Sequence, residues 1–185
     1  DQSTAPDGEV RFKQILSMLE RRQHLSPIFR RKLAFVPGNL GRPYWVEDPD
    51  FDMAYHVRHI ALPKPGDWRQ LCILAARINS QPLRRDKPMW EMYVIEGLNN
   101  VEGYPNGCFA LLLKVHHCAM DGATGTQFMN IVHDMTPETS DPGDPPPWMV
   151  ERPSRTRMLG RAYLDAWRKP GHALGFIKDS IPAFL

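Results

Sequence analysis

The sequence predicts an α/β fold for its first 136 residues, because segments with helical spacing of apolar residues alternate with short segments of extended character. One run, Cys108–Val115, is apolar on both parities apart from Lys114, and this pattern predicts a central strand buried on both faces. No segment of the chain repeats. We therefore expect one sheet with helices packed against it.

Three helices are expected in this part of the chain. Apolar residues spaced three and four apart predict them over about Glu9–Gln23, from the N-cap residue Asp67 to Gln81, and over about Thr124–Met135. Short segments bounded by turn-forming residues predict five strands: Leu33–Val36, Tyr44–Val46, Tyr55–Ile60, Trp90–Ile95 and Cys108–Val115.

A proline-rich segment divides the chain. Six prolines between residues 137 and 153 exclude a long helix or strand, so this segment is interpreted as a linker between a domain of residues 1–136 and a tail of residues 154–185. Residues 151–185 carry seven Lys or Arg against three acidic residues, whereas residues 1–150 are net acidic. The start of the tail has helical spacing, which Pro170-Gly171 ends.

Composition excludes several classes of protein. The net charge is only +2 and no long block of like charge occurs, so nucleic acid is not an expected partner. Three widely spaced cysteines do not form a disulfide framework and fit a reducing cytoplasm. The longest apolar run, Cys108–Leu113, is far shorter than the roughly 20 residues that span a bilayer.

Two histidines follow the apolar run directly, in the segment His116-His117-Cys118-Ala119-Met120-Asp121-Gly122. A histidine at a strand end is held by the sheet while its ring reaches a cleft, and its pKa suits proton transfer near neutral pH. Asp121 could fix the turn through a hydrogen bond or ion pair, and Gly122 could allow an unusual φ or a close approach. We therefore expect a rigid corner that presents one imidazole, which would be a suitable general base for an alcohol.

Two other interpretations of the histidines remain open on residue types alone, namely a metal site and simple packing at a strand end. A zinc site needs further ligands. The nearest candidates, His56 and His59, should point to opposite faces of a strand, so no metal site is expected. No Gly-x-Ser-x-Gly elbow occurs, and Cys118 is better explained as a small packed residue than as a nucleophile. If the protein supplies no nucleophile, the reaction would be a direct transfer within a ternary complex, with the base activating the acceptor.

The motif His-His-x-x-x-Asp-Gly at residues 116–122, with Gly125 after it, resembles the signature of the wax ester synthase/diacylglycerol acyltransferases, members of the CoA-dependent acyltransferase superfamily. The segment Pro88-Met89-Trp90-Glu91 resembles that family's second element, usually Pro-Leu-Trp. The exchange of leucine for Met89 conserves volume. The resemblance implies an acyltransferase-like two-layer sandwich, with a mixed sheet flanked by helices and a helical connector after it.

This resemblance also implies roles and substrates. His117 would be the catalytic base, with His116, Asp121 and Gly122 supporting its geometry, and Trp90 and Gly125 would serve packing or substrate binding. Acyl-CoA, used as a substrate rather than a cofactor, would donate a long acyl chain to diacylglycerol or a long-chain alcohol at the cytoplasmic side of a membrane or at a lipid droplet. Family members are more than twice as long, so residues 154–185 would lead to a C-terminal half of the enzyme that this sequence lacks.

Two rival functions stay open. Nonribosomal-peptide condensation domains share the histidine motif but use amine acceptors, and a non-catalytic interaction module would use the histidines only for packing. The basic tail could dock on anionic lipid or act as a connector between domains, and its short apolar stripe favours the connector. Trp45, Trp68 and Trp148 are expected to be core or cover residues, and Arg30-Arg31-Lys32 a solvated or sheet-edge run of charge.

Overall fold

The computed structural model describes residues 11–39, 41–120, 122–134, 136, 138, 140–146 and 154–168. A three-stranded mixed sheet lies at its centre, in the order β3-β4-β5. Strand β3 (Val57–Ala61) runs parallel to β4 (Trp90–Leu98), and β4 pairs antiparallel with β5 (Cys108–Val115). The expected α/β fold with a mixed sheet is confirmed.

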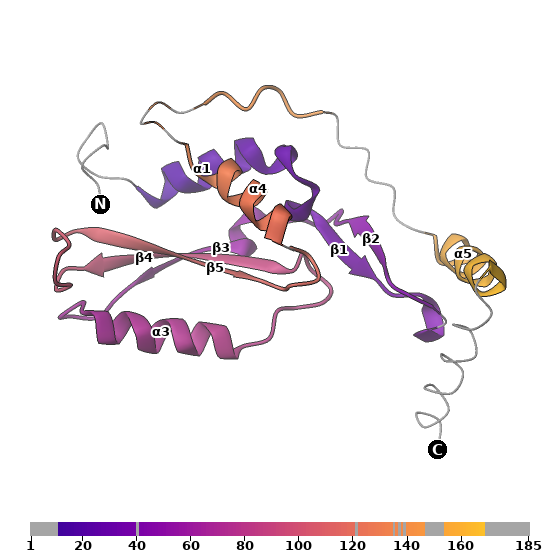
Figure 1. Cartoon of the computed structure of the whole chain (residues 1–185), viewed down its shortest axis with the longest axis horizontal. Helices are drawn as coiled ribbons and strands as arrows, with labels where there is room; N and C mark the ends of the chain where they lie inside the picture. The colour runs from indigo at the N-terminus through magenta and orange to yellow at the C-terminus, as the bar shows by residue number, and fades with distance from the viewer. Residues whose placement is uncertain are drawn as a thin grey trace, which may run out of the picture.

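Helices cover both faces of this sheet (Figure 1). Helix α3 (Trp68–Ser80) lies on one face, and α1 (Phe12–Arg22) and α4 (Gly122–Val132) lie on the other. Helix α3 is capped by Asp67 as predicted, because the Asp67 carboxylate accepts a hydrogen bond from the Gln70 N–H and the Gln70 side-chain oxygen accepts one from the Asp67 N–H.

The two faces of β4 belong to two separate apolar clusters. Trp90, Met92 and Val94 pack with the helices α1 and α4, whereas Tyr93 and Ile95 pack on the side of α3. This alternation is what a strand with both faces covered requires. Strand β4 is therefore the central element of the fold.

The prediction that Cys108–Val115 is the central strand is wrong. Strand β5 lies at an edge, no described strand pairs with its outer side, and Leu111 is exposed. An apolar run without alternation shows that both faces are covered but does not say how many neighbours a strand has. Helices lie on both faces of β5, so the run is apolar although the strand is peripheral.

A second difference concerns Tyr55–Ile60, which was expected to be extended throughout. Its first two residues belong to a short helix, α2 (Met53–His56), and β3 begins only at Val57. The Asp52 side chain accepts a hydrogen bond from the Ala54 N–H and so starts the helix. This cap turns His56 inward, where it is fully buried.

The remaining boundaries shift by a few residues. Helix α1 continues into a 3₁₀ turn, η1 (Gln23–Leu25), while α4 starts earlier and ends earlier than expected. Residues Glu9, Val10 and Met135 lie outside the described residues. The described parts of the linker, at residues 136, 138 and 140–146, form neither helix nor strand.

A hairpin projects from this body (Figure 1). Its antiparallel strands β1 (Arg31–Ala34) and β2 (Tyr44–Glu47) are preceded by a 3₁₀ turn, η2 (Pro27–Phe29), and connected through another, η3 (Pro37–Asn39). Helix α5 (Arg155–Arg168) packs on the far end of the hairpin, where an added Cβ at Gly41 would lie 3.3 Å from the Cβ of Ala162. The described start of the tail, residues 154–168, is therefore helical from Arg155 onward, as expected.

Among the described residues, no helix combines the length and the apolar character that crossing a membrane requires.

The packing of α4 provides a test of the fold. Phe128 is buried, and its ring stacks on Phe29 with the centroids 4.9 Å apart. Phe128→Ala should lower the free energy of unfolding by about 3–5 kcal/mol, measured by urea denaturation. The neighbouring Met129 is exposed, so Met129→Ala should change stability by less than about 0.5 kcal/mol. Similar losses in both variants would contradict this position of α4.

Candidate functional site

The two motif histidines lie on a tight turn between β5 and α4. His116 extends the sheet by one residue, because its N–H donates to the Met89 carbonyl at 3.0 Å. The Ala119 N–H then donates to the His116 carbonyl at 2.9 Å and closes the turn. His117 and Cys118 occupy its two central positions and are exposed. The expected strand, corner and helix are all present.

The two imidazoles differ in their surroundings. The Cys118 N–H donates to Nδ1 of His116 at 3.1 Å, so neutral His116 carries its proton on Nε2. His117 makes no hydrogen bond to a described residue, and its ring is open to solvent. The turn therefore uses His116 as a structural acceptor and leaves His117 available to another molecule.

The expected roles of the other motif residues, Asp121, Gly122 and Gly125, can be compared with the structure in part. Asp121 lies outside the described residues, so its expected role at the turn stays a prediction. Gly122 is the first residue of α4, where its φ is not positive and an added Cβ would meet no atom within 4 Å. Within the described chain, neither an unusual φ nor a close approach requires this glycine. A Cβ at Gly125 would lie 3.6 Å from the Met120 side chain, which is an ordinary contact.

Trp90, which was expected to serve packing or substrate binding, lies in the core cluster between the sheet and the helices α1 and α4. The side chain is fully buried, and its Nε1–H donates to the Phe29 carbonyl at 3.0 Å. The indole stacks on the His56 ring at a centroid distance of 4.7 Å. Trp90 thus supports the motif corner from beneath, since its strand neighbour Val115 directly precedes His116.

His56 is a buried titratable group next to this tryptophan. Its Nδ1 lies 2.7 Å from the Trp90 carbonyl, which can only accept, so Nδ1 carries the proton. Nε2 is then an acceptor, and no described group donates to it. Burial lowers the pKa of His56 below 6.5, against the opposing effects of the Trp90 carbonyl and of Glu91.

On the α3 side of the sheet, β4 carries a second polar group. The Tyr93 hydroxyl donates to Glu91 at 2.6 Å, and the guanidinium of Arg58 lies 3.7 Å from the other carboxylate oxygen. Burial and the bond to Glu91 raise the pKa of Tyr93 to about 12. These residues satisfy one another, so this group is structural. Among the described residues, no cluster of three metal-ligating side chains occurs.

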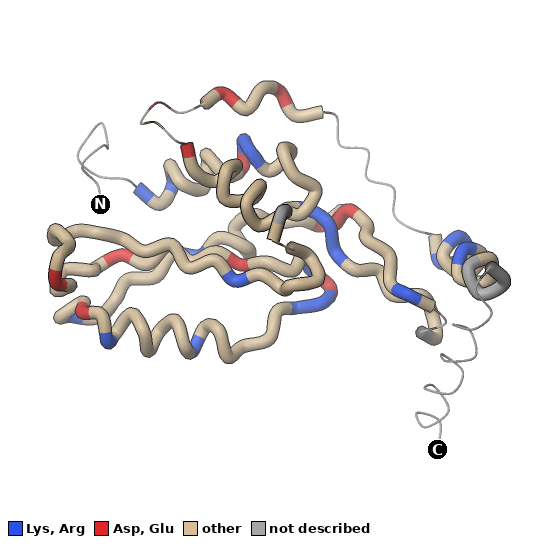
Figure 2. Tube along the Cα trace, viewed as in Figure 1, with Lys and Arg blue, Asp and Glu red and all other residues tan. Residues whose placement is uncertain are grey.

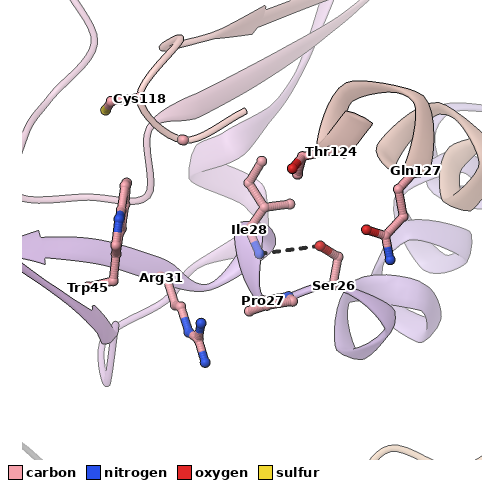
Figure 3. A pocket seen from close by; sticks show the side chains of 9 residues that line it. Ser26, Pro27, Ile28, Arg31, Trp45, Cys118, Thr124 and Gln127 are labelled. Atoms are coloured by element: carbon pink, nitrogen blue, oxygen red, sulfur yellow. Dashed lines mark hydrogen bonds between the residues drawn. The ribbon is translucent and has the colours of Figure 1, made fainter. Parts of the chain in front are cut away.

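A cleft opens beside the motif corner, between the hairpin and α4 (Figure 3). Its volume is about 280 Å³. Figure 3 shows Trp45 and Arg31 on the hairpin side and Thr124 and Gln127 on the side of α4, with Ile28 between them. The residues that line it are Ser26, Pro27, Ile28, Arg31, Trp45, Cys118, Ala119, Thr124 and Gln127.

No pattern in the sequence predicted that the hairpin would form one wall of this cleft. Trp45 was expected to be a core or cover residue, but it is 42% exposed, and Trp68 on α3 is 61% exposed. Trp148 lies outside the described residues. Arg31 is exposed, as expected for a solvated run of charge, yet it lines the cleft. Only the position of the hairpin against the motif turn shows that Arg31 and Trp45 belong to the site.

The described residues thus form a mixed β-sheet flanked by helices, with an exposed histidine, His117, just beyond the end of β5 and beside a cleft. The family model described as "Wax ester synthase/diacylglycerol acyltransferase catalytic domain" matches residues 1–183. The chain belongs to the wax ester synthase/diacylglycerol acyltransferase family.

Named relatives agree with this assignment. A protein of Mycobacterium tuberculosis that bears the name diacylglycerol O-acyltransferase (Rv3087) is 38% identical over 169 residues, which are 89% of this chain and 34% of the relative. Another from the same organism, tgs3, is 35% identical over 97% of this chain and 64% of its own length. The chain thus spans about a third of the first of these relatives.

A solved structure shows the same fold. The wax ester synthase/diacylglycerol acyltransferase from Marinobacter aquaeolei VT8 is 33% identical, with a TM-score of 0.52. The similarity covers 68% of this chain and 30% of that structure. The mixed sheet flanked by helices is therefore a fold of this family.

The buried His56 predicts how stability depends on pH. Because the folded state holds the pKa of His56 below 6.5, the unfolded chain binds a proton there more readily. The contribution of neutral His56 is fully present above about pH 6.5 and is lost as the pH falls below it. Urea unfolding at neutral and mildly acidic pH should show this loss.

His56→Gln keeps an N–H donor for the Trp90 carbonyl but does not titrate. Acidification should therefore lower the free energy of unfolding less in this variant than in the parent chain. The matched control is His133→Gln, because His133 is exposed and makes no ion pair with a described residue. This control should retain the loss of the parent chain. An equal acid-dependent loss in His56→Gln and in the parent would refute the assignment to His56.

Proposed function

We propose that this chain supplies the His117 wall of an O-acyltransferase that moves a long-chain acyl group from acyl-CoA to diacylglycerol or a long-chain alcohol. The products would be triacylglycerol or wax ester. The observation that carries the proposal is the exposed ring of His117 at the β5–α4 corner, which has no hydrogen-bond partner among the described residues, in a chain that matches the family's catalytic domain.

The proposed reaction is a direct transfer. The unprotonated nitrogen of His117 takes the proton of the acceptor hydroxyl while that oxygen attacks the thioester carbonyl. The tetrahedral adduct then collapses, the carbon–sulfur bond breaks, and the CoA thiolate takes the proton from the imidazolium. The acyl group has moved from sulfur to oxygen and His117 is regenerated. Acyl-CoA is a substrate in this scheme, and no resident cofactor is needed.

The surroundings of His117 support this role. His116 is occupied by the Cys118 N–H and cannot use Nδ1 as a base, whereas His117 has no described partner that competes for its proton. The turn is held at both ends, by the hydrogen bond from His116 to Met89 and by the start of α4. A base whose backbone is already ordered in this way loses little conformational entropy when a substrate binds.

The acceptors are lipids, so we place the reaction at a membrane or lipid-droplet surface on the cytoplasmic side. Helix α5 supports this placement, because it exposes Leu159, Tyr163 and Leu164 and carries Arg155, Arg157 and Arg161. Figure 2 shows basic positions on this helix in blue. Apolar and basic side chains together suit an anionic lipid surface. The described linker and α5 equally suit a connection to the remainder of a longer acyltransferase.

Transfer of radiolabelled acyl groups from acyl-CoA to diolein or hexadecanol tests the proposal. His117→Ala should reduce ester formation by about 10²–10⁴-fold, because general-base catalysis contributes that much. The control is His133→Ala, which removes an exposed histidine beyond the other end of α4 and should retain activity. Near-normal activity of His117→Ala would overturn the base assignment.

An amine acceptor in the same assay separates the lipid enzyme from a condensation domain. Labelled amide with an amine, and no ester with either alcohol, would exclude O-acyl transfer.

A further inference from the structure

The cleft beside His117 is lined by an exposed cation, Arg31. Arg31 makes no ion pair or hydrogen bond with a described residue. Glu47 lies opposite Arg31 in the hairpin register, but no ion pair joins them. The neighbouring cations have protein partners, since Lys32 binds Asp48 at 2.7 Å and Arg30 lies over the ring of Phe51. The guanidinium of Arg31 is thus free to bind an anion.

An indole accompanies this guanidinium. Leu33 pairs with Trp45 in the hairpin register, and Arg31 lies two residues before Leu33, so Arg31 and Trp45 project from the same face. Figure 3 shows both side chains at the cleft. An exposed indole can stack on an aromatic base, and a guanidinium can pair with a phosphate. Together the two residues have the chemistry that recognises an adenine nucleotide.

Of the proposed substrates, only the acyl donor, acyl-CoA, contains an adenine nucleotide. CoA contains an adenine ring and phosphates, whereas diacylglycerols and fatty alcohols have neither. The cleft, at about 280 Å³, is slightly smaller than the roughly 300–1,000 Å³ of sites that enclose a whole small ligand. It therefore suits one part of a large ligand.

We propose that this cleft binds the adenine nucleotide part of the acyl donor, with Arg31 on a phosphate and Trp45 against the adenine. Cys118 and Ala119 line the same cleft directly after His117, so the thioester arm leads from the hairpin to the motif corner. The acceptor must then approach His117 from another side. This inference rests on the proposed function for the identity of the ligand.

Calorimetric titration of the full chain with CoA tests the inference without catalysis. Arg31→Gln should weaken CoA binding roughly tenfold, the loss expected for one charge-assisted contact. Trp45→Ala should weaken it as well. The matched control is Arg69→Gln, which removes an exposed arginine on α3, on the other face of the sheet, and should bind CoA as the parent does.

Pantetheine, which lacks the nucleotide and its phosphates, separates a specific contact from a folding defect. Its affinity should be equal in the parent and in Arg31→Gln. Absence of CoA binding by the parent, or equal weakening in Arg31→Gln and Arg69→Gln, would overturn the inference. So would a parallel loss of pantetheine affinity. Failure of ester formation in the transfer assay overturns the proposed function instead, because these titrations measure binding alone.

Discussion

The structure depends above all on the contacts of Trp90 at the start of β4. The Trp90 indole N–H donates to the Phe29 carbonyl, and the Trp90 carbonyl accepts a hydrogen bond from the buried His56 ring. Trp90 also pairs with Val115 in the β4–β5 register. These three contacts join segments that are far apart in sequence. The base of the hairpin, the helix before β3 and the end of β5 meet at one residue. The motif corner can be rigid because the strand beneath it is fixed from both sides.

This arrangement explains why an exposed histidine can still be well positioned. A base at the end of a free loop would have to be ordered when the substrate binds, and that ordering costs free energy. Here His116 is bound to Met89, the residue directly before Trp90, and its ring accepts the N–H of Cys118. The corner is ordered by backbone contacts, and the His117 side chain itself does not have to contribute to the order.

The sequence predicted the local elements around the histidine motif better than the order of the strands. Helical spacing and the Asp67 cap predicted α3 closely, and the run into His116 predicted a strand, a corner and a helix. The central position of β4 was missed, because an apolar run records which faces are covered and not how many strands are paired. His56 was expected in a strand, since no local pattern distinguishes a short capped helix from extended chain at this length.

The position of Arg31 and Trp45 at the cleft could not be predicted from the sequence, for a different physical reason. Both residues line the cleft because of the direction in which the hairpin projects, and long-range contacts set that direction. Trp90 fixes the hairpin base at Phe29, while buried Asp48 binds Lys32 and lies 3.8 Å from Lys87.

Lys87 belongs to the segment just before β4, so the same stretch of chain that fixes the motif corner also fixes the wall that faces it. Removing Asp48 would leave two partly buried lysines without their anion, and such a loss is costly in a low-dielectric setting. The cleft and the motif corner that carries His117 are therefore held by the same segment of the chain. A donor held by the hairpin would meet His117 at a separation that the fold determines, and the acceptor would be the partner whose position remains adjustable.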